Sequence, residues 1–294
     1  MGAHVEEKEN TVHITTGPEG LHGARIFFDL VSVGATINVL LAAVKAKGLT
    51  IMENVAREPE IVDLATFLNN MGAHIRGAGT NEIRVQGVDS LKSMNVHTII
   101  PDRIEAGTYL SFAAANGNGV LVKNVITEHL DPFLSKLEEM GVRMEIDEDE
   151  IYVPGGDVLS PVNIKTSPFP GFATDLQQPI TPLLMQARGS STIIDTLYPE
   201  RTKHIPEMQR MGAKISSKDG IITVGHSTDL SGTVVEAGEI RAGVSLVGLA
   251  LMAKGTTVIN KADNILRGYD RIVEKFRGLS VDLEVINESE SLNH

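Results

Sequence analysis

Hydrophobic and polar positions along the chain predict two kinds of helix separated by short strands. Residues 32–47 are apolar nearly all round, with lysines only near the end, as in a helix that is buried on most sides. Residues 59–70 instead carry a single apolar stripe at helical spacing, and Pro59 suits the first turn of such a helix. The stripe consists of Ile61, Leu64, Ala65 and Leu68. Short apolar runs, such as residues 49–54, are typical of strands.

The same pattern returns about every 70 residues. The junction after each striped helix reads MGAH, MGAH, MGVR, MGAK and LSVD, and its second residues are Gly2, Gly72, Gly141, Gly212 and Ser280. A second marker begins a strand in each unit, at Gly48, Gly119, Gly189 and Gly255. Two independent markers with one period predict a repeat protein of four units that follow a leading partial unit.

The later units repeat both helices. In the third unit we expect Pro179 near the start of the buried helix and a bend near Pro182. The outer stripes are Leu130, Phe133, Leu134 and Leu137 in the second unit, and Tyr269, Ile272, Val273 and Phe276 in the fourth. Each unit is predicted to run strand, helix, strand, helix, strand, strand, which indicates an α/β fold.

The start of the chain and the segment near residue 100 divide this series. Residues 1–14 are predicted to finish a helix at Gly2 and to continue as two strands, so that they form the end of a unit. Residues 96–103, VHTIIPDR, follow a completed unit and precede a new helix, which favours a domain junction there. We therefore expect an incomplete first domain at residues 1–101, with one and a half units, and a second domain at residues 102–294, with three.

Composition narrows the classes of function. The net charge of −12, without any basic run, argues against a nucleic-acid partner, although a few arginines in a cleft can still bind a small anion. Cysteine is absent, and the nine histidines lack metal spacing, so we expect no metal, no disulfide and no thiol nucleophile. Nucleotide-binding glycine motifs are also missing, and no cofactor is predicted. The apolar runs are too short to span a bilayer and no signal peptide is present, so a cytoplasmic protein is expected.

The starts of the buried helices are candidates for an anion site. They read SVGAT, PDRIEAG, ATDLQQ and GEIRAG, and helix starts carry unpaired N–H groups and partial positive charge. Arg103, Arg241 and Arg267 lie at or near these starts in the predicted helices. The alternative is that the small residues only permit close packing and that the arginines are surface charges. Both interpretations stay open from the pattern alone.

Several carboxylates at helix starts have two interpretations. Asp175 and Asp102 either cap a helix or take part in the chemistry, because an N-terminal Asp commonly accepts backbone N–H bonds. Glu58 and Glu60 either complement a helix dipole or contact a substrate.

Longer motifs, taken in order, resemble one family. SVGAT, AREPEIVD, IPDRIEAGT, GFATDLQQP, YPERTKHI, SGTVVEAGEIRAG and ILRGYDRI are similar to segments of the UDP-N-acetylglucosamine 1-carboxyvinyltransferases, from Met1 to about Ile286. The resemblance implies a two-domain inside-out α/β barrel of repeated βαβαββ units. It also implies transfer of the enolpyruvyl group of phosphoenolpyruvate to the 3′-hydroxyl of UDP-N-acetylglucosamine, with release of phosphate and no metal or organic cofactor, at the first committed step of peptidoglycan synthesis.

The resemblance also implies roles for individual residues. Asp175 is the general base beside the sugar hydroxyl. Arg241 and Arg267 hold phosphoenolpyruvate, Arg201 is a further cleft arginine, and Glu239 stands where an aspartate is usual. Leu266 replaces a frequent aspartate before Arg267. The remaining candidates for substrate contact are Leu30, Val31, Ser32, Val33, Gly34, Leu197, Asp102, Glu58 and Glu60.

Part of the family pattern has no counterpart in the chain. A Lys-Asn pair, two arginines and the mobile loop with its Cys or Asp general acid are absent, and we expect this polypeptide alone to be unstable or inactive. Two alternatives remain: a remnant that binds a UDP-sugar without chemistry, and a shikimate-pathway enolpyruvyl transferase, which the AREPEIVD and RGYDRI segments fit poorly. The sequence does not give the oligomeric state.

Overall fold

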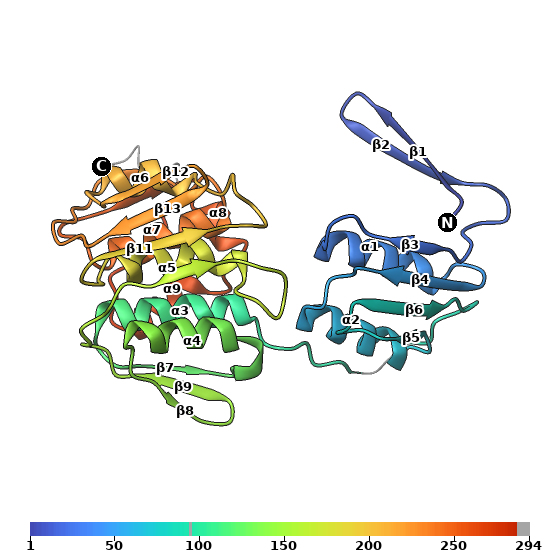
Figure 1. Cartoon of the computed structure of the whole chain (residues 1–294), viewed down its shortest axis with the longest axis horizontal. Helices are drawn as coiled ribbons and strands as arrows, with labels where there is room; N and C mark the ends of the chain where they lie inside the picture. Colours follow the sequence, from blue (N-terminus) through green and yellow to red (C-terminus); the bar gives the residue numbers. More distant parts are fainter. Residues whose placement is uncertain (94–95, 287–294) are drawn as a thin grey trace. The chain divides into compact units, whose positions relative to one another are not determined.

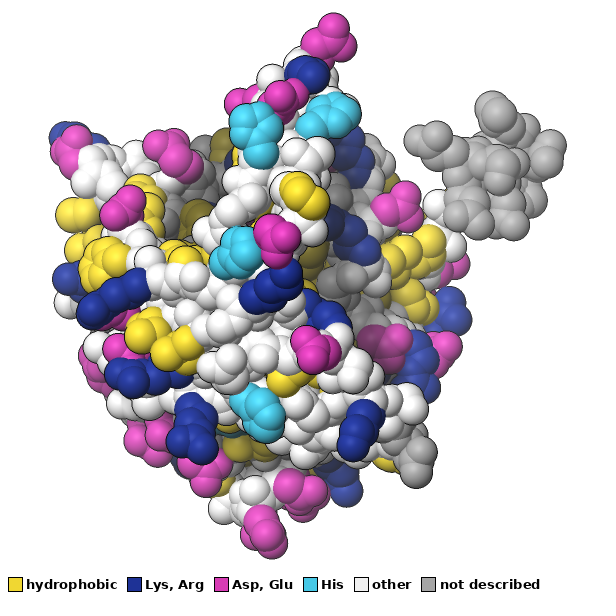
Figure 2. Space-filling model, turned by 90° about the vertical axis from the view of Figure 1, so that its right-hand side faces the viewer, with side chains coloured by type: hydrophobic (Ala, Val, Ile, Leu, Met, Phe, Trp, Pro, Cys, Tyr) yellow, Lys and Arg dark blue, Asp and Glu magenta, His cyan; other side chains and the backbone are white. Residues whose placement is uncertain are grey.

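A computed structural model describes residues 1–93 and 96–286 of the chain (Figure 1). It contains two compact units. Unit 1 comprises Met1–Pro101 and Pro168–Pro170, and unit 2 comprises Asp102–Ser167 and the chain from Gly171 onward. None of the helices within the described ranges is long and apolar enough to cross a membrane. On the face shown in Figure 2, basic and acidic side chains are interspersed, and no broad basic area is visible.

Unit 1 is a sheet covered by two helices, preceded by a hairpin. Its elements are β1 (Ala3–Lys8), β2 (Thr11–Thr16), β3 (Arg25–Phe27), α1 (Val33–Val44), β4 (Leu49–Glu53), α2 (Pro59–Asn70), β5 (His74–Arg76) and β6 (Glu82–Gln86). The sheet has the order β3-β4-β6-β5. Leu40 of α1 and Ile61 of α2 share one core with Met52 and Ile83 of the sheet, so both helices cover the same face. The predicted helices at residues 32–47 and 59–70 are confirmed.

Unit 2 consists of three successive groups of elements. The first group is α3 (Arg103–Asn116), β7 (Val120–Lys123), a 3-10 turn (Thr127–His129), α4 (Asp131–Met140), β8 (Glu145–Ile146) and β9 (Glu150–Val153). The second is β10 (Asn163–Lys165), a 3-10 turn (Thr174–Leu176), α5 (Gln177–Leu184), β11 (Ser190–Ile194), α6 (His204–Arg210), β12 (Ile215–Lys218) and β13 (Ile221–Gly225). The third is β14 (Val234–Glu236), α7 (Ile240–Ala250), β15 (Val258–Asn260), α8 (Asp263–Leu266) and α9 (Ile272–Gly278).

The sheet orders show the repeat directly. The order β10-β11-β13-β12 in unit 2 is that of β3-β4-β6-β5 in unit 1, with the same parallel and antiparallel pairs. The first group of unit 2 has β7-β9-β8 without the leading strand, and the third has only β14-β15. The prediction of six elements in every unit is therefore wrong for these two groups. Residues 279–286 form no strand, because they find no partner within the described chain.

Both series of marker residues occupy left-handed backbone. The φ angles of Gly2, Gly72, Gly141, Gly212 and Ser280 are 85°, 99°, 91°, 94° and 63°, and those of Gly48, Gly119, Gly189 and Gly255 are 99°, 70°, 147° and 84°. At four junctions of the first series, the residue after the marker donates its backbone N–H to the carbonyl of the residue five positions earlier. Ala73, for example, donates to Leu68, and this bond closes the end of the helix. The period in the sequence thus has a backbone cause. Gly2 leads directly into β1, and the helix end predicted there stays a prediction, because only Met1 precedes Gly2 in the given sequence.

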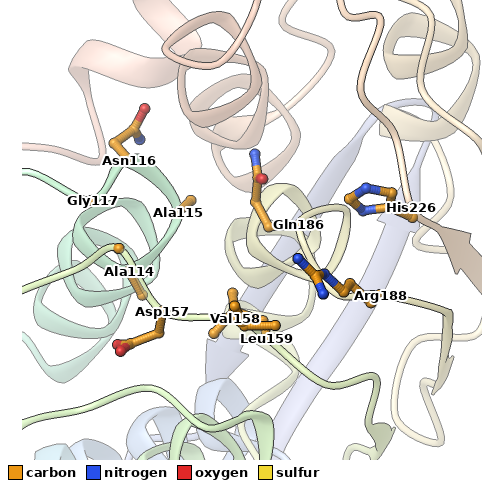
Figure 3. Close-up of a pocket in the computed structure, with 11 residues that line it drawn as sticks. Ala114, Ala115, Asn116, Gly117, Asp157, Val158, Leu159, Gln186, Arg188 and His226 are labelled. Atoms are coloured by element: carbon orange, nitrogen blue, oxygen red, sulfur yellow. The ribbon is translucent and has the colours of Figure 1, made fainter.

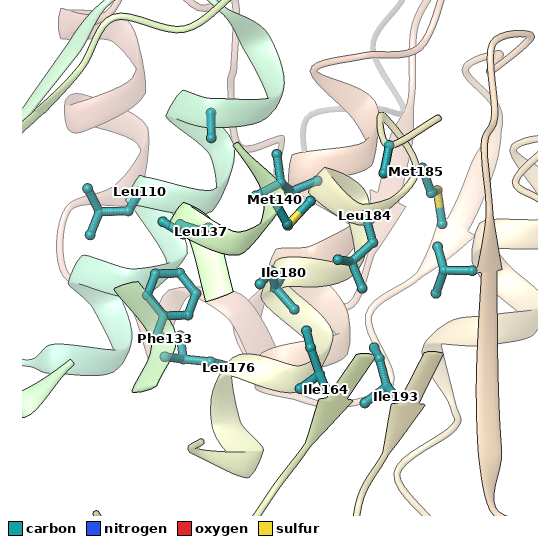
Figure 4. Packing of buried hydrophobic residues seen from close by; sticks show 14 of the residues in the cluster. Leu110, Phe133, Leu137, Met140, Ile164, Leu176, Ile180, Leu184, Met185 and Ile193 are labelled. Atoms are coloured by element: carbon teal, nitrogen blue, oxygen red, sulfur yellow. The ribbon is translucent and has the colours of Figure 1, made fainter. Parts of the chain in front are cut away.

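Three apolar helices fill the interior of unit 2. α5 packs against both α3 and α7, and every residue of α5 is buried. A Cβ on Gly107 of α3 would meet the Leu176 side chain at 2.8 Å, and one on Gly248 of α7 would meet the Phe112 ring, so glycine permits this close packing. Figure 4 shows the core around α5. Its labelled members are Leu110, Phe133, Leu137, Met140, Ile164, Leu176, Ile180, Leu184, Met185 and Ile193.

Two predictions about helices in unit 2 meet different outcomes. Pro179 lies in the first turn of α5 and Pro182 inside it, and α5 ends at Leu184, only two residues later. The helix predicted around Tyr269 is instead interrupted: α8 ends at Leu266 and α9 begins at Ile272, with Tyr269 buried between them. The stripe is still buried, because Tyr269, Ile272 and Phe276 share one core.

Candidate active site

The strongest polar cluster of unit 2 lies where the chain enters α5. Asp175 belongs to the 3-10 turn before this helix. One of its carboxylate oxygens lies 2.6 Å from Nη1 of Arg201, and the other lies 3.4 Å from Nη2 of Arg241. The side chain of Asp175 is 38% exposed and those of both arginines are 18% exposed. A carboxylate is therefore held between two guanidinium groups at the edge of solvent.

Asp175 does not cap a helix, although its position at a helix start made a cap one of the two interpretations. Its oxygens pair with guanidinium groups, and no side-chain bond caps α5. Burial raises the pKa of this carboxyl, but the charges of Arg241 and Arg201 outweigh that effect and hold the pKa below its usual value. Asp175 is consequently ionised at neutral pH, and it neutralises part of the positive charge of the site.

Arg241 connects the starts of three buried helices. It is the second residue of α7, and its guanidinium lies 5.4 Å from the centre of the Tyr269 ring. The hydroxyl of Tyr269 lies 3.0 Å from that of Thr108 in α3, and the charge of Asp102 at the start of α3 also acts on Arg241. Nη1 of Arg241 is buried and has no hydrogen-bond partner among the residues described. A charged donor is thus available to a further anion.

Arg201 belongs to the loop after β11. Its guanidinium stacks on the Tyr198 ring at 4.8 Å, and its Nη1 also donates to the hydroxyl of Thr174 at 3.1 Å. Thr174 in turn donates to Asp195 at 2.6 Å. Asp195 also accepts bonds from the backbone N–H groups of Leu197 and Tyr198. The sequence singled out neither Thr174 nor Asp195.

A second buried network reaches Glu239, which precedes α7 but makes no side-chain cap. Its Oε1 accepts a bond from Nε2 of Gln178 at 3.0 Å, and the same Nε2 lies 3.1 Å from Nδ1 of His204. Gln178 and His204 are fully buried. Burial lowers the pKa of His204 to about 3, so the ring is neutral and its Nδ1 accepts from Gln178. Both residues lie in the quoted motifs GFATDLQQP and YPERTKHI, but neither was a candidate, because the motifs do not show which of their side chains meet in the fold.

The remaining candidates have simpler surroundings. Asp102 caps α3, since its carboxylate accepts from the N–H groups of Ile104 and Glu105 at 2.8 and 3.1 Å. Arg103 is the first residue of α3. Arg267 is exposed and follows the end of α8, and the next residue, Gly268, packs against Ile240 at the start of α7. Leu197 is half-buried in the loop after β11.

The candidates in unit 1 lie before α1 and α2. Ser32 caps α1, and its hydroxyl accepts from the N–H of Ala35 at 3.2 Å. Leu30 is 80% exposed, while Val31 is half-buried beside the core of unit 1. Val33 and Gly34 form the first turn of α1. Glu58 precedes α2 without capping it, and Glu60 lies in the first turn of α2.

A pocket of about 450 Å³ lies at the opposite ends of α3 and α5, and no predicted site residue lines it. In Figure 3, Gln186, Arg188 and His226 lie on one side of it, and Ala115 and Asn116 at the end of α3 lie on the other. Nδ1 of His226 lies 3.0 Å from the carbonyl of Met185. Within the described residues no group of three His, Asp or Glu side chains is placed to hold a metal ion.

Solved structures give the class of protein. The enolpyruvyl transferase NikO from Streptomyces tendae superposes with a TM-score of 0.87 at 25% identity, over 96% of this chain and 69% of that one. EPSP synthase from Acinetobacter baumannii shares the fold with a TM-score of 0.70 at 19% identity, over 98% of this chain and 70% of that one. The fold is therefore that of the enolpyruvyl transferases.

Sequence comparisons give the family. The family model described as EPSP synthase (3-phosphoshikimate 1-carboxyvinyltransferase) matches residues 1–276. UDP-N-acetylglucosamine 1-carboxyvinyltransferase 2 of Lactiplantibacillus plantarum is 60% identical over 99% of this chain and 68% of its own length. UDP-N-acetylglucosamine 1-carboxyvinyltransferase 1 of Streptococcus agalactiae is 53% identical over 98% of this chain and 68% of its own. The chain belongs to the EPSP synthase family of enolpyruvyl transferases, and the predicted resemblance is confirmed.

Proposed function

We propose that this chain is a cytoplasmic UDP-N-acetylglucosamine 1-carboxyvinyltransferase of peptidoglycan synthesis. It transfers the enolpyruvyl group of phosphoenolpyruvate to the 3′-hydroxyl of UDP-N-acetylglucosamine and releases phosphate. The observation that carries the proposal is the carboxylate of Asp175 held by Arg201 and Arg241. Relatives that carry this name and are 53–60% identical over nearly the whole chain support the choice of acceptor.

The two arginines bind the anionic substrate in this proposal. Guanidinium groups form charge-assisted, often bidentate bonds with phosphate and carboxylate, and these bonds are strong where water is largely excluded. Both guanidinium groups are mostly buried, and Nη1 of Arg241 is without a partner in the part of unit 2 that is described. Arg267 and Glu239 complete the phosphoenolpyruvate site in the proposal.

Asp175 is the general base that takes the proton of the 3′-hydroxyl as the hydroxyl oxygen bonds to C2 of phosphoenolpyruvate. C3 takes up a proton from water as the double bond opens, and loss of phosphate from C2 together with a proton from C3 restores the double bond. With both guanidinium groups in place its pKa lies below the ordinary value, which makes it a weak base. A bound anion that draws the arginines toward itself removes part of this effect and raises the pKa. Asp175 thus becomes a better base only when the anionic substrate is present.

The nucleotide sugar has two sets of proposed contacts. In unit 2, Leu197 contacts the sugar nucleotide beside Asp175, and Asp102 lies at the adjacent helix start. In unit 1 the proposed contacts precede or open α1 and α2. They are Leu30, Val31, Ser32, Val33, Gly34, Glu58 and Glu60.

Shikimate 3-phosphate is the competing acceptor, because the matching family model carries the EPSP synthase description. Calorimetric titration of the chain with each acceptor separates the two proposals. We expect UDP-N-acetylglucosamine to bind and shikimate 3-phosphate to give no heat. The opposite result would contradict the proposed acceptor.

Asp175→Asn tests the proposed base. With phosphoenolpyruvate and UDP-N-acetylglucosamine present, we expect the variant to release phosphate at least roughly 100-fold more slowly than the unaltered chain, because an amide cannot take the proton. Asp157→Asn is the matched control, since Asp157 also pairs with an arginine, Arg143, but lines the pocket of Figure 3. Equal phosphate release by Asp175→Asn and the control would refute the assignment. Sugar binding without any phosphate release by the unaltered chain would identify a binding protein.

A further inference from the structure

Asp195 is a buried carboxylate with an unusual number of donors. It follows β11 directly and is 4% exposed. Oδ1 accepts from the hydroxyl of Thr166 at 2.8 Å and from the N–H groups of Leu197 and Tyr198 at 3.0 and 2.9 Å, while Oδ2 accepts from Thr174 at 2.6 Å. A buried carboxyl group is costly unless it is hydrogen-bonded, and here it has four donors.

The hydrogen-bond directions require an acceptor at this position. The hydroxyl of Thr166 already accepts from the N–H of Thr196 at 3.0 Å, and that of Thr174 accepts from Arg201 at 3.1 Å. Each hydroxyl therefore has its own hydrogen left for Asp195. Backbone N–H groups can only donate. A carboxylate only accepts hydrogen bonds and therefore satisfies all four donors. The side-chain amide of an asparagine would instead place its own N–H group against one of these donors.

Asp195 also departs from the repeat. Asn54, Asn124 and Lys261 follow the equivalent strands β4, β7 and β15, and their φ angles are 58°, 58° and 59°. Asp195 is not among the residues with positive φ. The turn after β11 is therefore shaped by the side chain of Asp195 rather than by left-handed backbone. This exception occurs in the group of elements that contains Asp175.

The network joins two parts of the proposed site. From Asp195 one path runs to the backbone of Leu197 and Tyr198, and the other runs through Thr174 to Arg201. We propose that Asp195 is a positioning residue that fixes the segment of Leu197 and Tyr198 relative to Arg201 and thereby aligns the nucleotide sugar with the reacting centre. This inference rests on the proposed function, because it takes Leu197 as a contact of the sugar nucleotide.

Substitution of Asp195 by Asn tests the inference with two readouts. In Asp195→Asn we expect the amide resonances of Leu197 and Tyr198 to shift and their hydrogen exchange to accelerate, because a neutral amide holds them less strongly. We expect the affinity for UDP-N-acetylglucosamine to fall by roughly tenfold or more. Asp157→Asn is again the control, with sugar affinity within about twofold of the unaltered chain and a comparable change in melting temperature.

A second pair of variants examines the path through Thr174. Thr174→Val removes the hydroxyl and Thr174→Ser keeps it. We expect Val to weaken the binding of phosphoenolpyruvate in calorimetric titration while the amide resonances of Leu197 and Tyr198 stay in place, and Ser to restore the affinity. This pair also serves if Asp195→Asn does not fold.

The outcomes separate the inference from the proposed function. Unshifted and equally protected Leu197 and Tyr198 amides in Asp195→Asn would overturn the inference, as would a loss of sugar affinity no greater than in Asp157→Asn. Equal phosphoenolpyruvate affinity of Thr174→Val and Thr174→Ser would overturn the path to Arg201. If the unaltered chain binds no UDP-sugar, the proposed function fails, and the amide measurement still decides whether Asp195 orders this segment.

Discussion

Buried polar side chains around Glu239 determine which charges the site contains. His204 is fully buried beside Gln178, and its pKa of about 3 keeps the ring neutral at any pH at which the protein works. Gln178 then supplies N–H groups to both Glu239 and His204. The positive charge near Asp175 therefore comes from arginines alone, whose charge does not change with pH.

The depressed pKa of His204 predicts an acid-sensitive stability. In the unfolded chain this His binds a proton near pH 6.5, whereas the folded chain binds it only near pH 3. Its contribution is therefore complete above about pH 6.5 and is lost as the pH falls toward 3. Relative to His204→Asn, the unaltered chain should lose about 2 kcal/mol of unfolding free energy between pH 6.5 and 5, measured by urea denaturation. Parallel curves for the two proteins would contradict the prediction.

At the residue scale, the sequence identified side chains that belong to long motifs. Asp175, Arg201 and Arg241 were candidates, and the structure brings both arginines within 3.4 Å of the Asp175 carboxylate. Asp195, Thr174, Gln178 and His204 were missed because their importance comes from burial and from partners far along the chain. Arg267 lies in the break between α8 and α9, next to Gly268, which packs on Ile240 at the start of α7.

At the scale of the element, left-handed junction residues close the helices. Gly72 has a φ of 99°, and a methyl group added to it would meet no atom within 4 Å, so only the backbone resists a side chain there. Ser280 holds the same place in the last unit with a φ of 63°, where glycine relieves strain.

Opposite substitutions at these two junctions test this cause. Gly72→Ala should lower the free energy of unfolding by about 1–2 kcal/mol, and Ser280→Gly should raise it by about 0.5–1 kcal/mol. Gly278→Ala is the control, since Gly278 has no positive φ and open space around it. The measurement is chemical denaturation of each variant. A stability change of the same sign at Gly72 and Ser280 would refute the backbone explanation.

Equivalent positions in two hairpins differ sharply in burial. Ile75, Ile83 and Val85 of β5 and β6 are 5%, 0% and 0% exposed under α1 and α2. Their counterparts by register in β1 and β2 are Val5, Val12 and Ile14, which are 58%, 59% and 66% exposed. The same strand pattern therefore contributes core in one hairpin and surface in the other.

This difference predicts unequal costs for one substitution. Ile83→Ala should lower the free energy of unfolding by about 2–5 kcal/mol, because it leaves a cavity in the core of unit 1. Ile14→Ala should change it by less than about 0.5 kcal/mol, because the side chain is already in water. Thermal denaturation of both variants gives the comparison. A large loss for Ile14→Ala would mean that β1 and β2 bury this side chain in solution.

Elements were predictable where periodicity and end signals agreed. Both ends of α2, Pro59 and Asn70, were predicted correctly, because a proline opens the helix and a glycine follows it closely. Within residues 279–286 the structure has no strand after α9, because a strand also needs a neighbouring strand, which its own sequence cannot supply. The interruption between α8 and α9 was likewise hidden, since both pieces bury residues on one helical stripe.

At the scale of the whole molecule, one repeated unit serves two purposes. Its left-handed junctions and buried helices make the core, and the charged residues at the starts of α5 and α7 make the proposed site. The comparisons give the family of enolpyruvyl transferases, and the proposal adds that Arg241 and Arg201, which both contact Asp175, bind the anionic substrate.

Calorimetric titration with phosphoenolpyruvate in the presence of UDP-N-acetylglucosamine tests this claim most directly. Arg241→Gln should weaken binding of phosphoenolpyruvate by roughly tenfold or more, since it removes a buried charged donor. Arg188→Gln, at the opposite end of α5, should bind like the unaltered chain. Equal affinity in Arg241→Gln and the unaltered chain would contradict the account.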